Sequence, residues 1–175
     1  MDDTIIVALY LDDLIITGNN VDLILGLKKQ LSATFEMTDL GILHFFLCIQ
    51  VLKMDDRIFI SQPKYVLDLL KRLRMEECKA CLTHFQSSFK LTKYCDSSKV
   101  NAPLYRQMVS SLIYLTHSPP NISFVVSVVS QFMQNPRESH WQVAKRIVCY
   151  IKGTYQFGIK YGRNIDNLVG FIEHD

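Results

Sequence analysis

The spacing of hydrophobic and polar residues changes along the chain and divides it into two kinds of structure. In the first third, short β-branched apolar runs predict buried strands at residues 5–10 and 14–17, a long strand at 42–53 and a short one at 58–60. One helix interrupts them, from residue 21 to about 35, where apolar side chains recur at helical spacing behind a Gly-Asn-Asn loop. The opening third is therefore expected to consist of hairpins and one helix.

From residue 61 onward helical spacing dominates. Ser61 is predicted to cap a helix that has Pro63 in its first turn, and further helices are predicted at 104–117, 122–134 (capped by Asn121) and 138–153. Residues 76–102 lack periodicity, and strands are predicted at 157–161 and 168–172. Hairpins, then helices, then strands indicate an α+β fold, with a domain boundary near 153–156. The expected inward side chains are Val66, Leu69, Leu70 and Leu73, then Tyr105, Met108, Val109, Leu112 and Ile113, then Trp141, Ala144, Ile147, Val148 and Ile151.

Asp12 and Asp13 interrupt this pattern, because two adjacent carboxylates stand inside an apolar run. An ionised carboxylate is costly to bury unless something pairs with it, so one interpretation is a site for a cation. The other is a tight hairpin turn, since Asp is common in turns. The local pattern leaves both open. A second pair, Asp55-Asp56, has Lys53 and Arg57 beside it and predicts an ordinary solvated turn.

Composition narrows the class of protein without fixing its function. The 175 residues are 49% hydrophobic and 21% charged, which is enough apolar material for a core, and the net charge of +2 permits contact with nucleic acid without requiring it. Five cysteines and no secretory signal predict reduced thiols in an intracellular protein of the cytoplasm or nucleus, and no apolar run has the length of a membrane span.

Two local motifs each have a functional and a structural interpretation. Cys78-Lys-Ala-Cys81 could be half a zinc site or a redox pair, but His84 and Cys95 do not form a second tight pair, so zinc is disfavoured. Basic residues line one side of the helix after Pro63 and could track a nucleic-acid backbone. Solvation and the helix dipole would produce the same basic pattern.

Longer segments resemble one known family. Leu9-Tyr-Leu-Asp-Asp-Leu-Ile-Ile-Thr-Gly18 resembles the Tyr-x-Asp-Asp hairpin of reverse transcriptases, in particular those of copia-type LTR retrotransposons. Residues 37–47, 60–65, 105–116 and 130–154 resemble further segments of that family in the same order. The resemblance covers essentially the whole chain.

The resemblance implies a reverse transcriptase, an RNA-directed DNA polymerase that acts on an RNA template, a DNA primer and nucleotides with two divalent ions, normally Mg²⁺. It implies that Asp12 and Asp13 are catalytic metal ligands, that Tyr10 lies near the primer end, and that a hairpin near residues 43–50 grips the primer. By the same resemblance, 1–77 is a partial palm with the start of the thumb, 78–153 the connector and helical thumb or connection, and 154–175 the start of an RNase H-like domain. The candidate nucleic-acid contacts are Lys64, Lys71, Arg72, Lys145 and Arg146.

The chain also departs from the family pattern. A further catalytic aspartate and the fingers are expected well upstream of the hairpin, and the residues before Ile5 do not supply them. Cys48 stands where Gly is usual, Cys149 where Arg is usual, and Glu173 where the first RNase H carboxylate is expected. We therefore expect a fragment of a Pol polyprotein that is inactive as an isolated chain and has no membrane partner. The alternatives are a non-catalytic nucleic-acid-binding remnant and an inert pseudogene product.

Overall fold

The computed structural model describes residues 2–85, 91–93, 97–118 and 120–162, which fall into two compact units. The first ends at Leu43 and the second begins at His44. The mixed α and β content, with antiparallel sheets, agrees with the predicted class. The assignment to palm, thumb and RNase H, with divisions near residues 77 and 153, stays a prediction.

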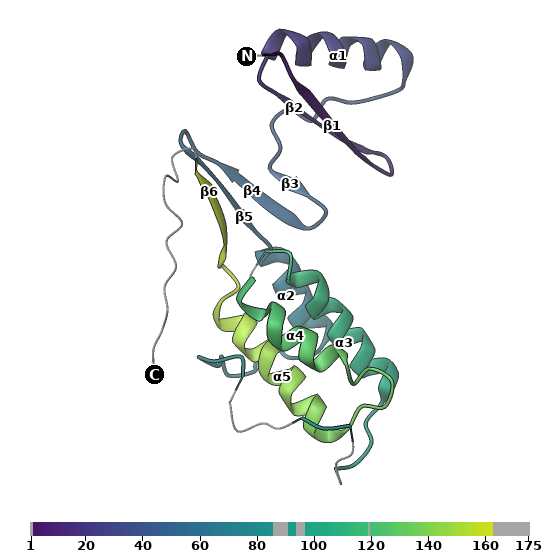
Figure 1. Cartoon of the computed structure of the whole chain (residues 1–175), viewed down its shortest axis with the longest axis vertical. Helices are drawn as coiled ribbons and strands as arrows, with labels where there is room; N and C mark the ends of the chain where they lie inside the picture. Colours follow the sequence, from purple (N-terminus) through teal and green to yellow (C-terminus); the bar gives the residue numbers. More distant parts are fainter. Residues whose placement is uncertain (1, 86–90, 94–96, 119, 163–175) are drawn as a thin grey trace. The chain divides into compact units, whose positions relative to one another are not determined.

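The first unit is a β-hairpin followed by a helix (Figure 1). Strand β1 (Ile5–Tyr10) pairs antiparallel with β2 (Asp13–Gly18), and helix α1 (Val21–Thr34) follows. The Asn20 side chain accepts hydrogen bonds from the backbone N–H groups of Asp22 and Leu23, at 3.0 and 3.3 Å, and so caps α1 as the sequence predicts.

The strands of this hairpin are not buried, contrary to the sequence prediction. Among residues 2–43 no side chain is fully buried, and on β1 Ile6 is 61% and Leu9 73% exposed. One helix can cover only one face of a two-stranded sheet, and α1 contacts the hairpin through β2. The apolar character of the strands therefore exceeds what this unit itself covers.

The second unit contains a four-stranded antiparallel sheet in the order β3-β4-β5-β6. Its strands are β3 (Phe45–Phe46), β4 (Ile49–Lys53), β5 (Arg57–Ser61) and β6 (Gly158–Gly162). The prediction of one long strand over 42–53 is wrong, because Leu47 and Cys48 adopt left-handed φ angles of 46° and 61° and turn the chain back on itself.

Strand β6 joins the sheet where a glycine allows it. A Cβ at Gly158 would lie 2.1 Å from the carbonyl oxygen of Ile60, so a side chain there would displace the backbone. In Figure 1, β5 runs directly into α2 and α5 leads into β6. The sheet of the second unit is thus connected to its helices twice, at the start of α2 and at the end of α5.

Four α-helices pack together in the described part of the second unit: α2 (Pro63–Arg72), α3 (Ala102–Leu115), α4 (Ser123–Ser130) and α5 (Glu138–Gly153). A short 3₁₀ turn, η1 (Pro120–Ile122), precedes α4. Their apolar faces form the core, as predicted, except that Ile113 is 42% exposed and Leu73 and Trp141 are only half-buried. The core side chains are Val66, Leu69, Leu70, Tyr105, Met108, Val109, Leu112, Leu115, Ile122, Val125, Val126, Val129, Phe132, Val143, Ala144, Ile147, Val148, Tyr150 and Ile151.

Two predicted helix caps are wrong. Ser61 is the last residue of β5, where it pairs with Gln50 and Gly158, so Gln62 precedes α2 instead. Asn121 lies within η1, and its amide donates to the Tyr150 hydroxyl at 2.5 Å. Pro63 does begin α2 as predicted.

Some predictions fall outside the described residues. These are the strand at 168–172, the RNase H carboxylate Glu173 and the thiol of Cys95. None of the helices in the described ranges combines the length and apolar character needed to cross a bilayer.

Candidate functional site

The tip of the β1–β2 hairpin carries the Asp pair. Tyr10 and Asp13 are the last paired residues of the two strands, so Leu11 and Asp12 form the two-residue turn between them. Both aspartates are exposed. The turn interpretation of the pair is therefore correct in geometry, and it places both carboxylates at the end of a hairpin rather than inside a core.

The turn contains a strained residue. Leu11 has a φ of 52°, a left-handed conformation that two-residue hairpins usually give to Gly or Asn. A leucine there costs on the order of 1–2 kcal/mol. Strain of this kind in a native structure suggests a functional constraint at that position.

Neither Asp12 nor Asp13 has a side-chain hydrogen bond or an ion pair with the residues that the structure describes in its unit. The second pair, Asp55-Asp56, differs, because the Arg57 guanidinium donates to the Asp56 carboxylate at 2.5 and 2.6 Å. These hydrogen bonds lower the pKa of Asp56. Both oxygens of each hairpin aspartate are thus left to solvent or to a ligand. In the Asp55-Asp56 turn, by contrast, Arg57 binds both carboxylate oxygens of Asp56.

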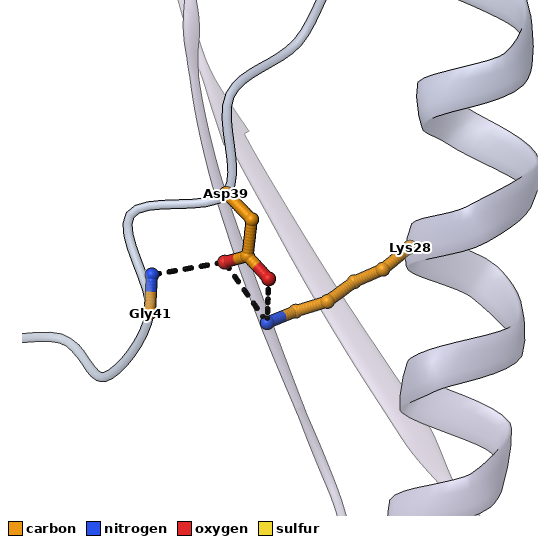
Figure 2. Close-up of polar contacts among 3 residues, drawn as sticks. All are labelled: Lys28, Asp39 and Gly41. Carbon is orange, nitrogen blue, oxygen red and sulfur yellow. Dashed lines mark hydrogen bonds and ion pairs between the residues drawn. The ribbon is translucent and has the colours of Figure 1, made fainter.

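A third exposed aspartate in the first unit is neutralised within the chain. Figure 2 shows Asp39 accepting from the Lys28 ammonium at 2.9 and 3.1 Å and from the Gly41 backbone N–H at 2.9 Å. These contacts lower the pKa of the Asp39 carboxyl, and the hydrogen bond from Lys28 has the largest effect. The Lys28 ammonium is therefore engaged by Asp39.

The carboxylate oxygens of Asp12 and Asp13 are the hard donors that Mg²⁺ prefers. Within the described ranges, however, no group of three or more His, Cys, Asp and Glu side chains is placed to hold a metal ion. The pair thus fits a divalent ion in donor chemistry and supplies part of a ligand set. Tyr10, 51% exposed, lies directly across from Asp13 and therefore on the same face of the hairpin.

The predicted nucleic-acid contacts divide into two groups on the second unit. Lys64 lies in the first turn of α2, with its ammonium 5.5 Å above the Phe45 ring, whereas the exposed Lys71 and Arg72 end that helix, about 10 Å along its axis. On α5, Lys145 lies 5.2 Å above the Trp141 ring and the Arg146 guanidinium donates to the Thr83 hydroxyl at 2.9 Å. The five cations do not form one compact site.

Sequence reasoning missed two features of the structure that bear on the candidate sites. The sequence did contain a signal for the strain at Leu11, because the two-residue turn has neither Gly nor Asn. The hydroxyl of Tyr114 donates to the carbonyl of Leu47 and ties the β3–β4 turn to α3, a contact over 67 positions that no local pattern reveals.

Comparison with known proteins matches both halves of the chain. A family model described as reverse transcriptase (RNA-dependent DNA polymerase) matches residues 1–87. A Pol polyprotein from transposon RE1 of Arabidopsis thaliana is 39% identical over 86% of this chain, and one from transposon TNT 1-94 of Nicotiana tabacum is 32% identical over 98%. An uncharacterized mitochondrial protein of Arabidopsis thaliana is 37% identical over 95% of this chain and 70% of its own length.

The chain spans only 10% and 14% of the two Pol polyproteins. No solved structure matches it. The likeness nevertheless runs through the Tyr-x-Asp-Asp hairpin and on through the helices of the second unit, in agreement with the resemblance seen in the sequence. The chain belongs to the reverse transcriptase family of copia-type retrotransposon Pol polyproteins.

Proposed function

We propose that Asp12 and Asp13 are metal ligands of the nucleotide-transfer site in the parent polymerase. The observation that supports this most directly is their state: two adjacent carboxylates, exposed at a strained hairpin tip and unpartnered in the described part of their unit. When bound there, divalent ions would activate the primer 3′ oxygen and stabilise charge on the departing pyrophosphate.

The hairpin itself would position these groups. The β1–β2 backbone pairing fixes Asp13 as the first residue of its strand and Asp12 in the turn before it. Tyr10, on the same face as Asp13, would place its ring against the primer end. Lys28 cannot compete for the pair as a counter-ion while it is held by Asp39.

We further propose that the isolated chain does not extend a primer with either Mg²⁺ or Mn²⁺. Two carboxylates alone repel one another and provide few of the ligands that a pair of metal ions needs. The described residues bring no third acidic or histidine side chain to the hairpin.

Paramagnetic broadening tests the metal role without requiring activity. In a backbone NMR spectrum, added Mn²⁺ is expected to broaden the amides of residues 10–14 well before those of residues 54–57, because Asp56 is already paired with Arg57. The double variant Asp12→Asn, Asp13→Asn should lose the selective broadening. Equal broadening at the two acidic turns would contradict the proposal.

A primer-extension assay tests the activity claim separately. We expect no template-dependent extension by the purified chain with Mg²⁺ or Mn²⁺. Extension that is lost in Asp12→Asn would refute the inactivity of the isolated chain while supporting the metal role of the pair.

A second candidate function is non-catalytic binding of nucleic acid. It is favoured by the exposed ammonium and guanidinium groups of Lys71 and Arg72 at the end of α2, neither of which forms an ion pair within the described residues. Contacts of this kind reach phosphates and make binding depend steeply on salt.

The matched test compares Lys71→Glu, Arg72→Glu with Lys160→Glu, an exposed cation on β6. Loss of two phosphate contacts should reduce the slope of log affinity against log salt by about 2. Equal effects of the two variants, or no duplex binding at low salt, would remove this candidate. A broad, non-cooperative unfolding transition would instead favour the third alternative, an inert product.

A further inference from the structure

The segment that follows α2 lies against one face of α5. The backbone N–H of Cys81 donates to the carbonyl oxygen of Cys149 at 3.2 Å. One turn further along α5, a Cβ at Gly153 would lie 3.3 Å from the Ala80 Cβ, so the glycine lets the segment approach the helix closely. Cys149 and Gly153 are four residues apart and share this face.

A lysine on the same helix holds the segment from its other end. The Lys152 ammonium donates to the carbonyl oxygens of Glu76 and Cys78, the latter at 2.8 Å. Three separate backbone groups of residues 76–81 are thus hydrogen-bonded to α5. These hydrogen bonds fix the position of the Cys-x-x-Cys motif against α5.

Three thiols meet at this contact. The thiols of Cys78 and Cys81 are the neighbours of the Cys149 thiol on one pocket wall, and burial, followed by these neighbours, raises the pKa of Cys149 to about 12. All three are free cysteines and only partly buried. They line a pocket of about 450 Å³ whose wall also includes Lys145 and Arg146.

We propose that Cys81 and Cys149 form a thiol–disulfide exchange site for a small anionic disulfide of the oxidised-glutathione type. Cys81 is the partner because its backbone hydrogen bond to Cys149 brings the two backbones within the range that a disulfide spans, and both side chains line the same pocket. The cations Lys145 and Arg146 at the pocket wall favour a disulfide that carries carboxylates.

The exchange balances in two steps. The Cys81 thiolate attacks one sulfur of oxidised glutathione, the glutathione S–S bond breaks, and one glutathione leaves as a thiolate that takes up a proton. Cys149 then attacks the Cys81 sulfur, its proton passing to the thiolate of the neighbouring Cys78, and the second glutathione leaves as a thiolate that takes up that proton. Two protein thiols are oxidised to one disulfide, and oxidised glutathione is reduced to two thiols.

The product would connect the segment after α2 covalently to α5. A cross-link between positions 81 and 149 restricts the unfolded chain over a long loop, which raises stability. Cys78 remains a free thiol in this scheme and acts through Cys149, so it is a positioning residue. Its replacement should slow the second step without preventing the bond.

Peptide mapping of the whole chain tests the pairing. The reduced protein is equilibrated with mixtures of reduced and oxidised glutathione, quenched with acid, treated with N-ethylmaleimide and digested with trypsin without reductant. Cleavage after Arg74, Lys79, Lys90, Arg146 and Lys152 places Cys78, Cys81 and Cys149 in three different peptides, 75–79, 80–90 and 147–152. We expect the linked pair 80–90 with 147–152, and a higher Tm for the oxidised than for the reduced protein.

The variants make the outcome decisive. Cys149→Ser and Cys81→Ser should each abolish both the linked pair and the oxidation-dependent rise in Tm, whereas Cys78→Ser should retain both. A linkage of Cys78 to Cys81 or to Cys149, a rise in Tm that survives Cys149→Ser, or complete maleimide labelling of Cys149 at every glutathione ratio would overturn the proposal.

Discussion

Replacing Cys48 by glycine is expected to stabilise the second unit. Cys48 has a φ of 61°, and the left-handed conformation costs a residue with a side chain roughly 1–2 kcal/mol. Glycine adopts it freely but loses more conformational entropy on folding, a cost of about 0.5–1 kcal/mol. The difference predicts that Cys48→Gly raises the free energy of unfolding by about 0.5–1 kcal/mol.

The increase in unfolding free energy should apply to the whole second unit, because the β3–β4 turn is hydrogen-bonded to other elements of that unit. The Tyr114 hydroxyl on α3 donates to the Leu47 carbonyl, and the Val51 N–H donates to the His44 carbonyl at 2.9 Å. Strand β4 also pairs with β5, which runs directly into α2. Strain in the turn is thus relieved when the unit unfolds.

Urea unfolding followed by the fluorescence of Trp141 measures the effect, since this is the one tryptophan of the sequence and lies on α5. We expect the midpoint to rise by about 0.5 M in Cys48→Gly. Cys48→Ala is the matched control, because it removes the thiol and keeps the Cβ, and its midpoint should stay unchanged. A glycine variant no more stable than the alanine variant would refute the reasoning.

Three further predictions follow from buried or paired polar groups. Tyr105→Phe removes the hydrogen bond that this fully buried hydroxyl donates to a carbonyl of α4 at 2.8 Å, and it should lower the free energy of unfolding by about 1–2 kcal/mol in urea titrations. Burial lowers the pKa of His140 below 6.5, so the unfolded chain takes up the proton first as pH falls, and stability should drop below about pH 6.5. His140→Gln should reduce this pH dependence of stability only in part, because burial also lowers the pKa of His84. An unchanged slope of unfolding free energy against pH in His140→Gln would contradict the prediction. The Asp39 pair with Lys28 forms above the ordinary Asp pKa and is lost as pH falls through the lower folded value, so the Gly41 amide shift should titrate with a midpoint below 3.8 and not at all in Asp39→Asn.

Local periodicity predicted most of the elements. Helices α1, α3 and α5 start and end within a few residues of the predicted limits, and α2 starts at Pro63 as expected, because their apolar side chains repeat at helical spacing and Asn20 and Pro63 mark two starts. The valine-rich α4 is also a helix as predicted, although it ends at Ser130 rather than near residue 134. These signals are short-range, and a single sequence contains them.

The failures have non-local or rare causes. A turn at Leu47-Cys48 cannot be predicted from residues that avoid left-handed φ, and only the family's usual Gly at position 48 pointed to it. The end of β5 at Ser61 depends on pairing with Gly158, far along the chain. The candidate thiol site depends on Cys149, which local motifs do not connect with the Cys-x-x-Cys segment.

The Asp pair shows why a turn and a ligand site are not competing interpretations. If Asp12-Asp13 served only to turn the chain, ordinary turn chemistry would place Gly or Asn where Leu11 is strained and would use the aspartate side chains for local hydrogen bonds. Neither is observed in the described residues, whereas the Asp55-Asp56 turn does pair a carboxylate with its neighbour. A turn that accepts strain and leaves both carboxylates free breaks the local rules without a structural gain, and sequences tend to break those rules where function requires it. The geometry of the hairpin therefore supports the metal role that the family relationship suggests.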